Sequence, residues 1–293
     1  MGAVLTILFA GFGLLLPWGL ALYRRFQVRG DEIFPGWIGS RPFLHSLLAY
    51  VLAFNLTFFI QELFLVLPKA LVPGLHPTLF HNNHDWTGDA PIAELFQGTG
   101  ALAILVSGLA FAWLVSRQER PGLLPLWMAF HGLFQSLPQF VVGAIVAEND
   151  MGRAYDYLGL GTLGEAALAL LALAAMPVAG LWVGRRFIAS AWKAAPIATQ
   201  RTRFGYLLRM AGLPALAAIP IIIFYRIPRE LIEVLASPVL VPLFGYGWMQ
   251  LAAFRPSDIV GRGQPPSSVM PLLLAALVLL AIFQLVLRPG IAF

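Results

Sequence analysis

The sequence contains no cysteine and few charged residues. Only 11% of its 293 residues are Asp, Glu, Lys or Arg, whereas a soluble domain carries about 25%. The absence of cysteine excludes disulfide bonds, thiolate metal sites, thiol catalysis and S-palmitoylation. With 59% hydrophobic residues and a mean hydropathy of +0.79, the composition also excludes an intrinsically disordered chain and argues against an ordinary soluble enzyme.

Apolar segments long enough to cross a membrane recur along the chain. A membrane-spanning helix needs about 20 mostly apolar residues. Such segments predict an all-α, polytopic integral membrane bundle of about eight transmembrane helices, at 3–22, 43–67, 94–115, 123–147, 162–183, 207–224, 231–253 and 269–287. Because no linker divides the chain, residues 1–293 are expected to form one transmembrane domain. Two segments contain internal prolines, which predict broken or re-entrant helices: Pro214, Pro220, Pro238 and Pro242.

Basic residues are unevenly shared between the two sets of connectors. Fourteen of the 19 Lys and Arg residues lie in the odd-numbered connectors, and five lie on the other side. Cytoplasmic connectors are enriched in Lys and Arg, so we expect the odd connectors in the cytoplasm and both termini outside it. The overall composition is typical of a bacterial inner-membrane protein. Its basic residues therefore indicate topology and contact with the lipid bilayer, not binding of nucleic acid.

The longest basic connector, 184–209, mixes Arg and Lys with aromatic residues. This mixture is typical of an interfacial amphipathic segment on anionic lipid. A plain basic loop is the alternative.

Three of the five histidines, His76, His81 and His84, fall within nine positions of the connector 68–93. Imidazole nitrogens suit Zn²⁺. The spacing of His81 and His84 places them on one face if this piece is helical. The connector therefore predicts a zinc site at the extracytoplasmic face. A polar loop whose His and Asn side chains cap turns is the alternative interpretation.

Polar residues interrupt the second and fourth predicted spans. Glu62 lies inside an apolar run, and an ionised carboxylate costs roughly 2.5–3.5 kcal/mol at the centre of a membrane helix. We therefore expect Glu62 to face the bundle interior, as a general base or a metal ligand. His131, Gln135 and Gln139 recur every four residues and form one polar stripe. The stripe predicts a substrate cavity or a proton path, with interhelical hydrogen bonding as the alternative.

A short connector after the fourth predicted span carries acids beside glycine and arginine, in Glu148-Asn149-Asp150-Met151-Gly152-Arg153. We expect Asp150 at the membrane boundary, facing Glu62 and the histidine-rich connector. The alternative is an ordinary turn with a local ion pair between Asp150 and Arg153.

The order of these motifs resembles the site-2 proteases, which are polytopic intramembrane zinc metalloproteases. That family places H-E-x-x-H on one core helix, small and polar residues on the next, and an aspartate motif two helices on. Here Gln61-Glu62-Leu63-Phe64-Leu65 stands where H-E-x-x-H would. Residues 97–102 resemble the small-residue helix, and residues 149–153 are similar to the aspartate motif. The resemblance covers residues 43–160, whereas residues 162–287 match no known type.

The resemblance implies a metal-dependent membrane hydrolase, in which three residues would hold zinc: His81, His84 and Asp150. Glu62 corresponds to the general base that activates zinc-bound water, and His131 would contact substrate or carry protons. Gln61 and Leu65 replace both histidines of the family motif. A degenerate relative without proteolysis is therefore the other outcome.

Two further functions fit the same residues. In an ion- or proton-coupled transporter or channel-like protein, Glu62 and the stripe from His131 to Gln139 would line the pathway. In a non-catalytic assembly factor, the chain would bind another membrane protein and tolerate substitution of these residues.

Overall fold

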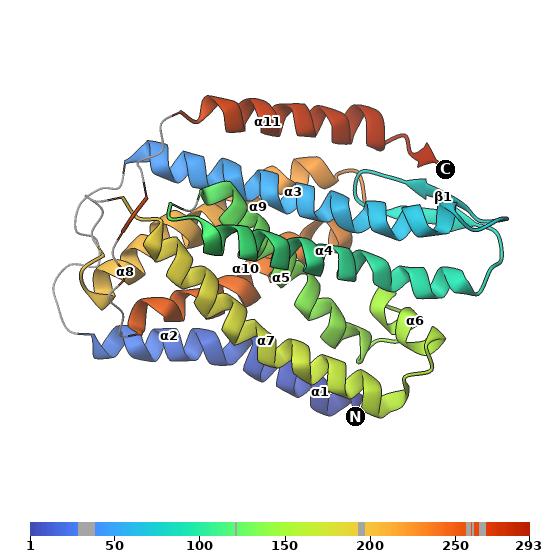
Figure 1. Ribbon diagram of the computed structural model, residues 1–293, viewed down its shortest axis with the longest axis horizontal. Coiled ribbons are helices and arrows are strands. Elements are labelled where there is room, and N and C mark those ends of the chain that lie inside the picture. Colours follow the sequence, from blue (N-terminus) through green and yellow to red (C-terminus); the bar gives the residue numbers. More distant parts are fainter. Residues whose placement is uncertain (29–38, 121, 193–196, 256–258, 260, 264–267) are drawn as a thin grey trace.

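Helices form nearly all of the secondary structure (Figure 1). The computed structural model describes residues 1–28, 39–120, 122–192, 197–255, 259, 261–263 and 268–293. In chain order the helical elements are α1 (Gly2–Leu8), η1 (Phe9–Leu15), α2 (Leu16–Gln27), α3 (Ser40–Ala70), α4 (Ile92–Arg117), α5 (Leu123–Gly143), α6 (Asp150–Tyr157), α7 (Gly161–Ala189), α8 (Gln200–Leu207), η2 (Leu208–Gly212), α9 (Leu213–Arg226), α10 (Leu231–Met249), η3 (Gln250–Phe254), α11 (Met270–Ala281) and η4 (Ile282–Leu287).

Seven continuous helices in the described part of the chain are long and apolar enough to cross a membrane: Gly2–Gln27, Ser40–Ala70, Ile92–Arg117, Gly161–Ala189, Gln200–Arg226, Leu231–Phe254 and Met270–Leu287. They indicate a multi-pass membrane protein built as a helical bundle. The predicted number of eight such helices is wrong by one, because the segment 123–147 forms α5, which does not belong to this set. The polar stripe lowers the hydropathy of α5, and its residues are mostly buried against α3, α4, α7 and α10.

The two spans with internal prolines are not broken. Pro214 stands in the first turn of α9, and Pro238 and Pro242 lie inside α10, yet both helices continue. Pro214 has no N–H to offer the Met210 carbonyl four residues earlier. The hydroxyl of Ser46, on α3, donates a hydrogen bond to that carbonyl instead. A neighbouring helix thus compensates for the proline, so the prediction of broken or re-entrant helices is wrong.

The crossing of α4 and α5 brings two backbones into contact. A Cβ atom on Gly132 would lie 2.4 Å from the Cα atom of Gly108 and 2.7 Å from the Ile104 carbonyl oxygen. Only glycine permits this approach. On its other side α5 meets α3, where the His131 ring packs against Tyr50 and Phe54. These contacts hold α5 at the centre of the bundle.

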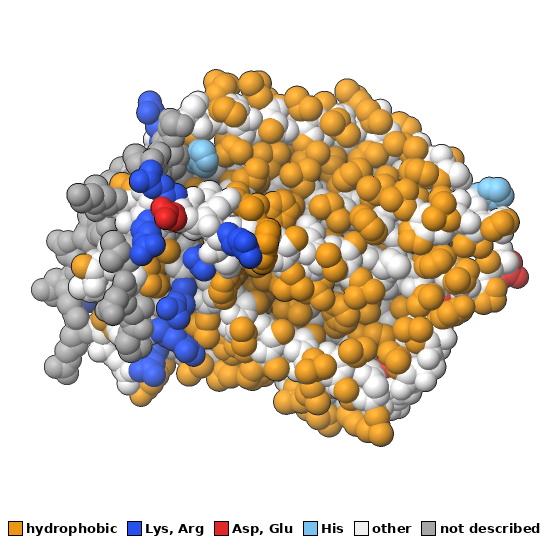
Figure 2. Space-filling view, in the orientation of Figure 1, with side chains coloured by type: hydrophobic (Ala, Val, Ile, Leu, Met, Phe, Trp, Pro, Cys, Tyr) orange, Lys and Arg blue, Asp and Glu red, His pale blue; other side chains and the backbone are white. Residues whose placement is uncertain are grey.

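The two ends of the bundle differ in structure and charge. The sheet end carries α6 and a small sheet of order β2-β1-β3, formed by β1 (His76–Leu79), β2 (His84–Thr87) and β3 (Ile291–Ala292). The basic end carries the end of α2, the start of α3 and α8 (Figure 1). Lys and Arg side chains gather there on the face shown in Figure 2, and hydrophobic side chains cover the middle.

Both chain termini lie toward the sheet end (Figure 1). Which end faces the cytoplasm stays a prediction. Within the basic connector predicted to lie on lipid, α7 extends to Ala189 and α8 begins at Gln200, and residues 193–196 lie outside the described residues.

Candidate functional site

A β-hairpin lays His84 against the end of α3. Strands β1 and β2 are antiparallel, with Leu79 opposite His84. The Nδ1 atom of His84 lies 2.9 Å from Glu62 Oε2, and its Nε2 atom lies 3.0 Å from Gln97 Oε1 on α4. The side chains of His84 and Glu62 are only 8% and 6% exposed. The hairpin therefore creates a buried contact between an acid and a base that are 22 residues apart.

The partners of His84 suit a ring that carries a proton on each nitrogen. A carboxylate oxygen and an amide oxygen both accept hydrogen bonds, and only the charged imidazolium donates from both of its nitrogens. A half-turn of the Gln97 amide would present a donor instead and suit the neutral ring. That half-turn would also give up the contact between Lys69 Nζ and Gln97 Oε1, at 3.4 Å, so the two protonation states of His84 differ in the partners of Lys69.

Two more charged groups, Lys69 and Asp150, lie near this contact. Together with Glu62, His84 and Gln97 they form what we call the acid–base cluster. Lys69 is fully buried and donates a hydrogen bond of 2.8 Å to the Leu65 carbonyl, and its Nζ atom lies 3.4 Å from Gln97 Oε1. Asp150 stands in the first turn of α6. Burial raises the pKa of Asp150, as does Glu62, whereas His84, Lys69 and Arg153 lower it.

The rim of the cluster is an ion pair beside an aromatic ring. Arg153 donates from two nitrogens to the carboxylate of Glu94 on α4, at 2.7 Å for the Nη2 bond. The cations of Arg153 and Lys69 lie 5.1 and 4.5 Å from the centre of the Trp86 ring. The local ion pair between Asp150 and Arg153, one of the two sequence interpretations, is therefore not the pair that forms.

Small residues on α4 allow this cluster to assemble. A Cβ atom on Gly100 would lie 2.7 Å from Leu65 Cγ and 3.0 Å from Gln61 Cγ. The absence of a side chain at this position lets α3 and α4 pack closely. Gln97, almost one turn earlier on α4, then reaches His84.

A chain of amide groups, here the amide track, begins at Gln61, the residue before Glu62, and runs into the bundle. Gln139 Nε2 donates to Gln61 Oε1 at 2.9 Å and to the Gln135 carbonyl at 2.8 Å. Gln135 Nε2 lies 3.3 Å from Nδ1 of His131. His131 is fully buried and enclosed by aromatic rings, including Tyr50, whose centroid is 4.4 Å away. His131 thus lies at the inner end of the amide track, outside the acid–base cluster.

A cavity of about 380 Å³ lies beside the amide track. Elements η1, α3, α5, α6 and α10 contribute to its walls. Its polar lining residues are Gln61, Gln135, Gln139, Asn149, Asp150 and Ser237. Its aromatic lining residues are Phe9, Phe58, Phe134 and Phe244. Among the described residues of the lining, Asp150 alone is ionisable, so this carboxyl group joins the cavity to the acid–base cluster.

The structure brings some of the predicted site residues together and separates others. Glu62 and His84 are in contact, and Asp150 lies within their electrostatic influence. His81 lies in the hairpin turn beside the backbone of Arg226 and Ile227, and burial lowers its pKa. The predicted helical face shared by His81 and His84 does not form, because this connector is a hairpin.

The predicted zinc ligands do not form a matching donor set. In the described part of the chain, no group of three or more His, Asp and Glu side chains could hold a metal ion. Glu62 and His84 bond to each other, and His81 lies instead beside the backbone of Arg226 and Ile227. Zinc binding stays a prediction, to be tested by metal analysis.

Three residues of the site were not predicted to act together: Gln61, Lys69 and Gln97. Lys69 follows Glu62 by seven residues, which is two helical turns on the same face. That spacing is a usable signal for a buried acid with a cationic neighbour. The contact of Gln97 with His84 has no such signal, because it depends on where the hairpin docks.

No family model, curated protein or solved structure matches the chain.

Proposed function

We propose that this multi-pass membrane protein exchanges protons for cationic, amphipathic compounds. One observation carries the proposal: Asp150 belongs both to the cavity lining and to the acid–base cluster. A ligand in the cavity and a proton on the cluster therefore act on the same carboxyl group. This arrangement favours the proton-coupled transporter among the functions that the sequence suggested.

The cavity suits a ligand that is positively charged and partly apolar. The carboxylate of Asp150 accepts no hydrogen bond from any residue that the structure describes, and burial raises its pKa. His84, Lys69 and Arg153 stabilise the ionised Asp150 only without direct contact, so a cation in the cavity would supply the direct partner that this carboxylate lacks. Phenylalanine rings attract cations through their faces, and amide oxygens of the lining offer further acceptors. A volume of about 380 Å³ is within the range of small-molecule sites.

The acid–base cluster supplies the proton coupling. With neutral His84, the formal charges of Glu62, Asp150 and Lys69 add up to minus one, and protonation of His84 brings the cluster to neutrality. The neutral cluster attracts a cation less strongly, so protonation of the cluster weakens the binding of the cationic ligand. By thermodynamic linkage, the ligand must weaken proton binding by the same factor. Mutual weakening of this kind is the requirement for exchange.

Binding of two ions of the same shape tests the charge preference. Tetraphenylphosphonium and tetraphenylborate are nearly isosteric and carry opposite charges. We expect the detergent-purified protein to bind tetraphenylphosphonium more tightly than tetraphenylborate. Burial raises the pKa of Asp150 above its ordinary value of 3.8, so this binding should also strengthen as the pH rises and Asp150 loses its proton. The Asp150→Asn variant should bind tetraphenylphosphonium about tenfold more weakly, because a partly buried charge pair is lost.

The matched control is Asp156→Asn, which removes an exposed carboxylate from the same helix. It should leave binding unchanged. Equal affinity for the two ions, or an Asp150→Asn variant that binds like wild type, contradicts the cation site. In proteoliposomes, an imposed proton gradient should drive accumulation of tetraphenylphosphonium, and Glu62→Gln should abolish it. Binding without gradient-driven accumulation would refute the proposed transport but would still support a cation-binding site at Asp150.

A further inference from the structure

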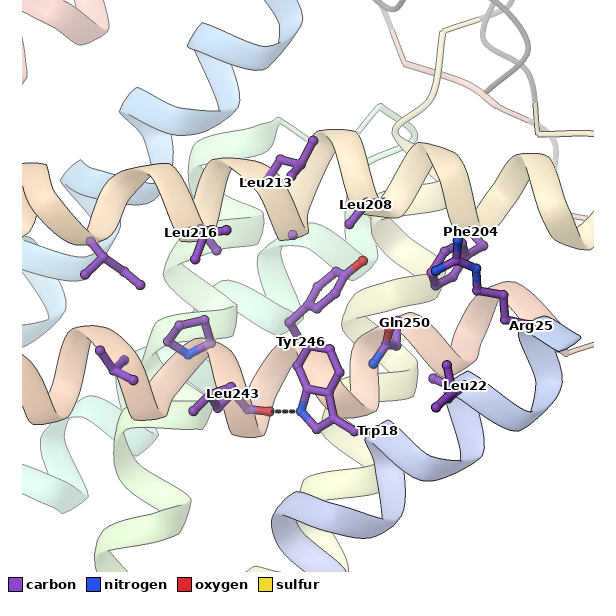
Figure 3. A pocket seen from close by; sticks show the side chains of 16 residues that line it. Trp18, Leu22, Arg25, Phe204, Leu208, Leu213, Leu216, Leu243, Tyr246 and Gln250 are labelled. Carbon is purple, nitrogen blue, oxygen red and sulfur yellow. Dashed lines mark hydrogen bonds between the residues drawn. The ribbon is translucent and has the colours of Figure 1, made fainter. Parts of the chain in front are cut away.

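A second cavity lies near the basic end of the bundle, among α2, α8, η2, α9 and α10 (Figure 3). Its volume is about 380 Å³, and most of its lining is aliphatic or aromatic. No acidic side chain belongs to the described lining, in contrast to the cavity at Asp150. Its charged residue is Arg25, in the last turn of α2. The two cavities therefore have opposite charge.

The lining of this cavity changes from polar to apolar along its length. Figure 3 shows Arg25 and Phe204 at one end, with Leu216 toward the other and Gln250 and Tyr246 between them. The guanidinium of Arg25 lies 5.8 Å from the centre of the Phe204 ring and forms no ion pair with a carboxylate that the structure describes. A cation is thus available at the polar end of an apolar groove.

Two buried donors in the lining have no partner within the described protein. They are the hydroxyl of Tyr246 and the Nε2 atom of Gln250, in side chains that are 6% and 3% exposed. The nearby Trp18, by contrast, donates its indole N–H to the Leu243 carbonyl at 2.9 Å (Figure 3). Buried polar groups in folded proteins nearly always have a hydrogen-bond partner. Because the amide N–H and the hydroxyl are donors, oxygen atoms of a ligand can accept hydrogen bonds from both.

We infer that this cavity binds an anionic phospholipid. The headgroup phosphate pairs with Arg25, the ester oxygens lie near Gln250 and Tyr246, and an acyl chain follows the aliphatic wall past Leu216. The position of Arg25 supports this order, because it lies in the last turn of an apolar span, where lipid headgroups are found. The order of charge, hydrogen-bond donors and aliphatic surface in the cavity is the order of chemical groups along a phospholipid.

Native mass spectrometry of the detergent-purified protein tests this inference with lipids of identical acyl chains. We expect phosphatidylglycerol to bind about tenfold more tightly than phosphatidylcholine, because both lipids have the phosphate that pairs with Arg25 but the choline ammonium brings a second positive charge close to Arg25. Glycerol 3-phosphate, which has the anion without the chains, should not bind. Oleate, which has a chain and a carboxylate without a glycerol ester, should bind more weakly than phosphatidylglycerol. These arms separate a phospholipid from a free anion and from a fatty acid.

A pair of neighbouring arginines provides the matched variants. Arg25→Gln should remove the preference for phosphatidylglycerol, whereas Arg24→Gln should keep it, since Arg24 does not line the cavity and lies 3.4 Å from Gln27. Leu216→Trp, at a side chain that is 63% exposed, should fill the groove and weaken both lipids. It also provides a test if Arg25→Gln does not fold. Equal loss in the two arginine variants, or lipid binding unaffected by Leu216→Trp, would overturn the inference.

Discussion

Substitution of Gly132 by alanine tests how strictly the centre of the bundle is packed. The added Cβ atom would lie 2.4, 2.6 and 2.7 Å from backbone atoms of Gly108 and Ile104, against an ordinary contact distance of 3.4–4 Å. None of these atoms belongs to a flexible side chain, so α4 and α5 must separate by about 1 Å. Because Gly132 follows His131 directly, the shift would also move the inner end of the amide track.

The expected cost of Gly132→Ala follows from two opposing terms. Overpacking a well-packed core costs about 1–3 kcal/mol, and replacing glycine by alanine within a helix returns up to about 1 kcal/mol. Subtracting the second term from the middle of the first leaves a net loss of about 1 kcal/mol, which corresponds to a melting temperature lower by roughly 2–4 °C for a large domain. Thermal unfolding in detergent, followed by circular dichroism, measures the shift.

The control is Gly19→Ala on α2, where an added Cβ atom meets no heavy atom within 4 Å. Only the helix-propensity term applies there, so the melting temperature should stay the same or rise. If Gly132→Ala melts like wild type while Gly19→Ala behaves as expected, the close crossing of α4 and α5 does not constrain the bundle and the reasoning is refuted.

Two further predictions concern the acid–base cluster. Burial raises the pKa of Asp150 from its ordinary value of 3.8, so the native carboxyl stays protonated while the unfolded one ionises. As the pH rises from 3.8 to the raised pKa of native Asp150, the free energy of unfolding of wild type should therefore fall relative to that of Asp150→Asn. Below pH 3.8 the difference between the two proteins should no longer depend on pH. Melting curves of both proteins over acidic pH check the sign, and an opposite slope would contradict it. The proposed exchange uses no metal ion, so chelation should leave tetraphenylphosphonium binding unchanged. About one zinc per chain, lost in a His81→Ala/His84→Ala variant, would instead support the zinc-dependent hydrolase.

The positions of the long helices could be predicted from the sequence. The second span, expected at 43–67, is Ser40–Ala70, and the fifth, expected at 162–183, is Gly161–Ala189. This success has a local cause, since every backbone group of a helix in lipid is satisfied by residues of the same segment. An apolar run of sufficient length therefore predicts a helix without knowledge of its neighbours.

The candidate site could be predicted only in part. Glu62 was expected to face inward because a lone carboxylate in an apolar helix needs a partner, and it does so. The clustering of histidines in the connector predicts instead a zinc site shared by His81 and His84, and these two residues would lie on one face only if the connector were helical. The hairpin reverses the chain between these two histidines and directs them to different neighbours.

Composition within single segments was enough to predict the class of protein, the course of its long helices and the uneven distribution of its basic residues. The packing of the helices was needed to show that α5 is an inner helix and that Ser46 compensates for Pro214. It was also needed to show that His84 contacts both Glu62 and Gln97, within the electrostatic influence of Asp150. These contacts join residues far apart in the chain. Their formation depends on glycine-mediated helix crossings and on the docking of a short sheet, which no local pattern specifies.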